Sequence, residues 1–135
     1  MNRFLLLIAL TALLANCKPD QSTPASPLIG TWQLTTYCKP TSTSACTPVT
    51  VPTDRGVFVT FARNGEFNES YQNTRPIDYA FLGCGGTYQI EGKNVRIVTF
   101  FSSSLSGQLV EVVSLSADRL VLNPFGSGEY NFVRR

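Results

Sequence analysis

Apolar and polar residues alternate along most of the chain beyond residue 28, which is the pattern of strands with one buried face. The first such stretch, 28–38, contains the only tryptophan of the sequence. Trp32, Leu34 and Thr36 share one face of that strand, because successive side chains point to opposite sides. We therefore expect a half-buried first strand whose indole points into the core.

Further runs of this kind follow, each bounded by turn residues. Asn64-Gly65 is a strong hairpin signal, because both residues accept the positive φ that tight hairpin turns need. The stretch 39–55 is too polar and too often interrupted by proline to form an element. After the first strand, the pattern predicts strands at 56–61, 66–71, 86–90, 95–101, 107–115, 119–123 and 129–135.

The connections between these strands alternate in length. The turns around Asn64, Gly92 and Ala117 are tight, and the other connections are longer. In an up-and-down meander every second connection lies at the same end, so tight turns close one end and loops line the other. We predict an all-β fold, an eight-stranded antiparallel up-and-down barrel without a C-terminal helix. A flattened sandwich with the same strand order is the alternative.

Composition removes several classes of function. The 135 residues suffice for one domain. The sequence contains no histidine, which excludes a Ser-His-Asp or Cys-His catalytic set and leaves only cysteines and carboxylates for a zinc site. The formal net charge is +2 without a basic run, so nothing favours nucleic acid as a partner. We predict a protein that is not an enzyme and uses no metal or cofactor.

The N-terminus has the layout of a signal peptide. Arg3 precedes an apolar run at 4–14, which is too short for a permanent membrane span. The run ends in the sequence Leu-Ala-Asn-Cys at 14–17, which resembles the bacterial lipobox. An ordinary secretory signal with a coincidental cysteine is the alternative.

The lipobox resemblance implies where the chain is cleaved and attached. It gives a lipoprotein signal peptide at 1–16 and acylation of Cys17, by diacylglycerol and an acyl chain such as palmitate. Two or three acyl chains hold a protein firmly on a membrane, whereas one chain is marginal. Lys18 after the cysteine implies the outer membrane, and the Pro/Ser/Thr-rich stretch 17–27 reads as a lipid-anchored linker.

The strand beginning Gly30-Thr31-Trp32 and the hairpins after it resemble the lipocalin-like domains of small bacterial lipoproteins. Other matching stretches are 61–67, 86–90, 115–122 and 130–134. The resemblance covers 28–135 as one barrel domain. It implies architecture more strongly than function. From the loop-lined end, the aromatic residues near it and the lack of a catalytic set, we predict a non-enzymatic protein, lipid-anchored at the outer membrane or cell surface, that binds a small apolar or amphipathic ligand.

Several side chains are candidates for such a ligand pocket. They lie near the loop-side ends of their strands with an inward parity: Tyr71, Tyr88, Phe101, Leu109 and Tyr130. Glu69 shares the face of Phe67 and Tyr71, so it is either a polar handle within the pocket or evidence that the predicted face is wrong. The alternative is that these residues simply fill the barrel. The long loops at 39–55 and 72–85 would then contact an envelope protein partner.

Three cysteines, Cys38, Cys46 and Cys84, lie toward the loop-lined end. In an oxidising envelope two of them should pair. We predict a Cys38–Cys84 bond, with Cys38–Cys46 as the alternative. A metal site made of all three thiolates is less favoured, because no Cys-x-x-Cys spacing accompanies them.

Arg134 shares the face of Tyr130 and Phe132 in the last strand, which runs toward the closed end. Its guanidinium can therefore lie across Trp32, as the lipocalin-like resemblance also implies, and close that end of the barrel. A frayed terminal arginine in water is the alternative.

Overall fold

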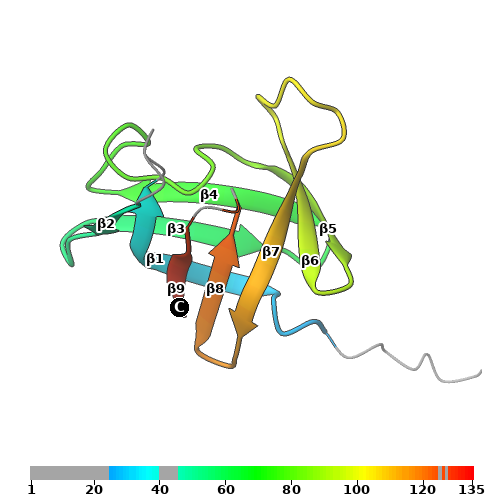
Figure 1. Ribbon diagram of the computed structural model, residues 1–135, viewed down its shortest axis with the longest axis horizontal. Coiled ribbons are helices and arrows are strands. Elements are labelled where there is room, and N and C mark those ends of the chain that lie inside the picture. Colours follow the sequence, from blue (N-terminus) through cyan, green and yellow to red (C-terminus); the bar gives the residue numbers. More distant parts are fainter. Residues whose placement is uncertain (1–24, 40–45, 125, 127) are drawn as a thin grey trace, which may run out of the picture.

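The computed structural model describes residues 25–39, 46–124, 126 and 128–135 (Figure 1). The predicted signal peptide, Cys17 and most of the linker lie outside these residues. The strands are β1 (Gly30–Lys39), β2 (Thr47–Thr50), β3 (Gly56–Phe61), β4 (Glu66–Gln72), β5 (Gly86–Glu91), β6 (Asn94–Thr99), β7 (Gln108–Leu115), β8 (Arg119–Asn123) and β9 (Tyr130–Arg134). Within the described residues, no helix is long and apolar enough to cross a membrane.

The strands form one sheet that closes on itself. Their order is β2-β1-β3-β4-β5-β6-β7-β8-β9, and β1 also pairs with β9. This last pairing joins the two sides, so β1 and β3–β9 form a closed antiparallel barrel of eight strands in meander order. The predicted fold class is therefore confirmed, and the strand boundaries differ from the predicted ones by two residues or fewer.

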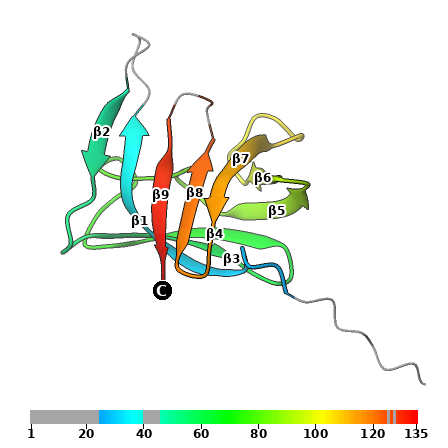
Figure 2. The same cartoon turned by 60° about the horizontal axis from the view of Figure 1, so that its bottom comes forward.

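Strand β2 corrects the expectation that 39–55 contains no element. Thr47–Thr50 pairs with the far end of β1, beyond the barrel proper (Figure 2). Pro48 lies opposite Cys38, whose N–H donates at 3.0 Å to the carbonyl of Glu129, the residue before β9 on the other edge of β1. Cys38 and Pro48 are therefore a non-hydrogen-bonded pair of the antiparallel ladder, because the polar backbone groups of Cys38 point away from β2. The nitrogen of Pro48 accordingly faces the free edge of the sheet. A proline there costs the ladder nothing and protects the edge from pairing with other chains.

A β-bulge changes the face that β1 presents to the core. The register with β9 shifts between Leu34 and Thr36. Trp32 and Leu34 are buried as expected, but the next buried side chain is Tyr37. The expectation that Thr36 shares the inner face was therefore wrong, because the extra residue reverses the parity of everything after it.

Trp32 closes the barrel at the end with the tight turns. Its indole Nε1 donates to Leu28 O at 2.9 Å, and the Arg134 guanidinium carbon lies 4.1 Å from the ring centroid. Arg134 also donates to the carbonyls of Ile29 and Pro27, at 3.1 and 2.6 Å, and to Ala117 O in the β7–β8 turn. One side chain thus joins the segment before β1 to the β7–β8 turn, which confirms the predicted closure.

Gly30 makes room for this arginine. Its φ is +139°, and a Cβ at this position would lie 2.5 Å from Arg134 Nη1. Any other residue would therefore push the guanidinium away from the indole.

Replacing Arg134 by alanine should lower the free energy of unfolding by about 2 kcal/mol, because the cation–π contact and the charged hydrogen bonds are lost together. Urea unfolding followed by the fluorescence of Trp32 measures this. Arg135→Ala is the matched control, since the Arg135 side chain is exposed and its backbone N–H keeps its bond to Thr31 O. Equal losses in the two variants would show that Arg134 does not hold the closed end.

Candidate functional site

The open end of the barrel is filled by the connection between β4 and β5. These strands share only two residue pairs, after which residues 73–85 fold back over the barrel. Phe81 in this connection is buried, with its ring centroid 6.3 Å from Phe67, 5.3 Å from Tyr130 and 5.4 Å from Phe132. A side chain of the protein therefore occupies the position where a ligand would enter.

Glu69 holds this connection in place. It is the buried charged residue of the described core, and its two carboxylate oxygens accept four hydrogen bonds. The donors are Tyr71 Oη at 2.6 Å and three successive backbone N–H groups, of Phe81 at 2.7 Å, Leu82 at 2.8 Å and Gly83 at 2.9 Å. An ionised carboxylate only accepts, so this set of donors matches its chemistry.

Two tyrosines, Tyr71 and Tyr130, interact with the Glu69 carboxylate. Tyr37 and Tyr130 stack with ring centroids 5.0 Å apart. Burial raises the pKa of Tyr130 to about 12, with smaller contributions from Tyr37 and the Glu69 charge. Burial also raises the pKa of Tyr71, and the hydrogen bond to Glu69 raises it further. These phenols therefore remain protonated in the folded protein well into alkaline solution.

The predicted pocket residues fall into two groups. Glu69, Tyr71 and Tyr130 come together at the open end, but around Phe81 rather than around an empty space. Tyr88 lies at the opposite end, where its hydroxyl donates to Ala62 O at 2.7 Å and its ring packs on Phe61. Its predicted loop-side position was wrong, because β5 extends past the β3–β4 turn.

Phe101 and Leu109 are also misplaced by the sequence pattern, since both side chains are exposed. Strand β6 ends at Thr99, so Phe101 belongs to a turn and has no inward face. In β7 the buried side chain is Val110, which gives Leu109 the outward parity.

The disulfide joins Cys38 to Cys46, and Cys84 has a free thiol. The preferred prediction, Cys38–Cys84, was wrong, and its alternative is confirmed. The bulge in β1 gives the reason, because it turns Cys38 away from the barrel mouth that contains Cys84. The hairpin with β2 then brings Cys46 to within 5.4 Å of Cys38, measured between Cα atoms.

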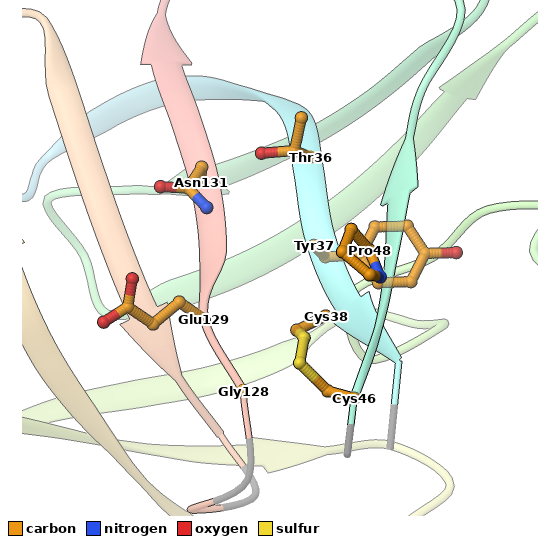
Figure 3. Close-up of a pocket in the computed structure, with 8 residues that line it drawn as sticks. All are labelled: Thr36, Tyr37, Cys38, Cys46, Pro48, Gly128, Glu129 and Asn131. Atoms are coloured by element: carbon orange, nitrogen blue, oxygen red, sulfur yellow. A yellow bond between two sulfur atoms is a disulfide. The ribbon is translucent and has the colours of Figure 1, made fainter. Parts of the chain in front are cut away.

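A groove lies on the outer side of this disulfide. It has a volume of about 380 Å³ and lies between β1, β2 and the start of β9 (Figure 3). Its lining combines the disulfide with polar side chains and a proline: Thr36, Tyr37, Cys38, Cys46, Pro48, Gly128, Glu129 and Asn131. In the described parts of the chain, no three His, Cys, Asp or Glu side chains gather closely enough to hold a metal ion.

Sequence reasoning did not identify Phe81 or the outer groove. Phe81 lies in a connection without periodicity, and its burial depends on Glu69, twelve positions earlier in the chain. The one available signal was Glu69 itself, because a carboxylate on the face of Phe67 and Tyr71 must find donors inside the barrel.

Comparisons with known proteins agree with this architecture. A family model described as a lipocalin-like domain matches residues 28–122. The chain is similar to a lipocalin-like protein from Bacteroides uniformis, with 20% identity, a TM-score of 0.58, and coverage of 81% of this chain and 99% of that chain. It is also similar to an uncharacterized protein from Bacteroides eggerthii, with 18% identity, a TM-score of 0.53, and coverage of 80% and 99%. The comparison with curated proteins found no match.

The open end should lose stability in alkaline solution. A tyrosine in the unfolded chain titrates near pH 10, so below that pH both states hold their protons and the contribution of these phenols is fully present. Above it, the unfolded chain releases protons that the folded chain keeps. Stability therefore falls with rising pH until the folded pKa of about 12 for Tyr130 is passed.

Urea midpoints measured from about pH 9 to pH 12 test this slope. Tyr130→Phe keeps the ring and removes the titration, so it should flatten the slope, whatever its effect at neutral pH. An equal slope in the variant and the parent would show that Tyr130 does not cause the loss of stability at high pH.

Proposed function

Because this chain belongs to the lipocalin-like domain family, we propose that it is a non-enzymatic binding module tethered to a bacterial envelope membrane. The barrel is its scaffold, and its recognition surface lies on the outside. The observation that carries this proposal is the burial of Phe81 in the barrel mouth, fastened there by Glu69.

The chemistry of the described site supports binding rather than catalysis. The sequence contains no histidine to act as a general base. Glu69 is the buried carboxylate of the described core, and both of its oxygens already accept hydrogen bonds from the chain itself rather than from a substrate.

The outer groove is the surface that we assign to recognition of another envelope protein. The Cys38–Cys46 bond limits the freedom of the β1–β2 hairpin, so the groove is largely pre-formed and little order is lost on binding. Gly128 lets the start of β9 pass close to this bond, since a Cβ there would lie 2.6 Å from Cys38 Cβ. Glu129 and Asn131 supply hydrogen-bonding groups on the other wall.

A small apolar ligand inside the barrel is the second candidate function. The position of Phe81 favours it, because an aromatic ring held among Phe67, Tyr130 and Phe132 marks a site that suits an apolar group. Such a ligand would have to displace the Phe81 ring from the barrel. During this change the β4–β5 connection could either keep its hydrogen bonds to Glu69 or lose them.

Replacing Phe81 by alanine separates the two functions. If Phe81 fills the barrel mouth, the parent protein should bind an environment-sensitive apolar dye only weakly. Phe81→Ala should bind it about tenfold or more tightly, because the variant opens an apolar cavity next to Phe67 and Phe132. The same substitution should lower stability by about 3 kcal/mol. Fluorescence titration and urea unfolding measure both effects.

Ile77→Ala is the matched control, because it also shortens a large apolar side chain of the β4–β5 connection, but at a position that is 84% exposed. Phe81→Leu provides a milder variant if alanine prevents folding. Tight dye binding by the parent that Phe81→Ala leaves unchanged would contradict the filled barrel and point to another cavity. Tight binding by the parent that is competed by fatty acids would favour the ligand-binding function.

The tether is supported by the sequence at 4–17. In the described residues the chain enters the barrel at its closed end, where Arg134 contacts Pro27 and Ile29. Cys17→Ser should leave unprocessed precursor or release the protein from membranes, because no acyl chain can be attached. Cell fractionation with intact-mass analysis checks this, with Cys84→Ser as the control. Mature Cys17→Ser protein that remains on membranes would contradict acylation as the tether.

A further inference from the structure

The loop between β6 and β7, residues 99–107, holds three large apolar side chains in water. Phe100, Phe101 and Leu105 are 76%, 88% and 97% exposed. Single exposed apolar residues are ordinary on soluble proteins, but several at one loop tip form a patch that indicates a binding surface.

The chemistry of this loop suits an apolar partner. No charged residue occurs between Arg96 and Glu111 in the sequence. The polar groups of the tip bond with one another: Ser102 N–H donates to Thr99 O at 3.1 Å, Ser104 N–H donates to Ser102 Oγ at 3.2 Å, and the Ser104 and Ser106 hydroxyls lie 2.6 Å apart. Removing the tip from water would therefore leave few hydrogen bonds unmade.

The base of the loop is held by the barrel. Phe100 N–H donates to Gly85 O at 2.9 Å, and Arg96 Nη1 donates to Ser106 O at 3.1 Å. Arg96 is itself held by two bonds to Glu91, at 2.6 and 3.0 Å. The apolar tip is therefore presented at a defined place on the barrel.

The loop belongs to the loop-lined end of the barrel, whereas the first described residues enter at the closed end, where Arg134 contacts Pro27. Both lie away from the β1–β2 corner (Figures 1 and 2). The linker ends on the barrel at Ser26, whose carbonyl accepts from Ile29 N–H, and residues 17–25 can span roughly 30 Å when extended, close to the length of a ten-residue strand such as β1. A chain tethered at Cys17 can thus tip until this loop reaches the same membrane.

We propose that the 99–107 loop is a membrane-contact site, in which Phe100, Phe101 and Leu105 enter the interface between lipid headgroups and acyl chains. A lipid surface fits better than a protein, because the tip has no charged or amide side chain for directional recognition, whereas hydrocarbon requires none. This contact would leave the outer groove free on the opposite side. This inference rests on one part of the proposed function, the lipid tether at Cys17.

Phe101→Trp in the full acylated chain tests the proposal. The protein is reconstituted into phosphatidylcholine vesicles whose acyl chains carry bromine, which quenches only nearby indoles. The new indole should lose most of its emission relative to vesicles without bromine. Trp32 is completely buried, so the parent protein supplies a constant background.

Ile77→Trp is the matched control, because Ile77 is 84% exposed but belongs to the β4–β5 connection. Quenching of Phe101→Trp but not of Ile77→Trp supports the membrane contact, and equal quenching of both overturns it. Protein that floats with the vesicles but is not quenched would overturn the loop contact and leave the tether unaffected. Protein that neither floats nor is quenched would overturn both the loop contact and the tether. Shielding of the new indole from aqueous iodide in native membranes, without quenching by brominated lipid, would identify a protein on the patch and overturn the proposal.

Discussion

Strand β1 has to pair with three neighbours, and this constraint determines the geometry of the rest. It pairs with β3 through its first half, with β2 through its last residues, and with β9 along its other edge. The bulge between Leu34 and Thr36 makes these three pairings compatible, because the extra residue bends β1 away from the barrel. Tyr37 then enters the core, and Cys38 becomes available to β2.

The two ends of the barrel are closed by opposite charges. At the closed end a cation, Arg134, gathers carbonyl groups of Pro27, Ile29 and Ala117. At the open end an anion, Glu69, gathers backbone N–H groups of the β4–β5 connection. Each charge satisfies backbone groups that strand pairing leaves without partners, so each fixes a segment that the sheet cannot hold. Both ends are therefore ordered by single side chains.

The regular part of the fold could be predicted because strand alternation has a period of two, and hairpins such as Asn64-Gly65 mark their own turns. Parity fails at the first irregularity: one bulge reversed the expected positions of Thr36 and Cys38, and with them the disulfide. The filling of the site could not be predicted either. Glu69 binds backbone N–H groups, which every residue carries, so the composition of 73–85 gives no sign of the contact.

A filled barrel is a suitable scaffold for a protein that works on its outside. Phe81 removes the void that a ligand-binding barrel must keep open, and burying it adds stability to the end where the long connections meet. That stability lets the outer wall hold a groove beside a disulfide on one side and an uncharged apolar loop on another. Because the two surfaces lie on opposite sides of the barrel, occupation of one does not block the other. The membrane contact and the partner groove that we propose are therefore compatible with each other.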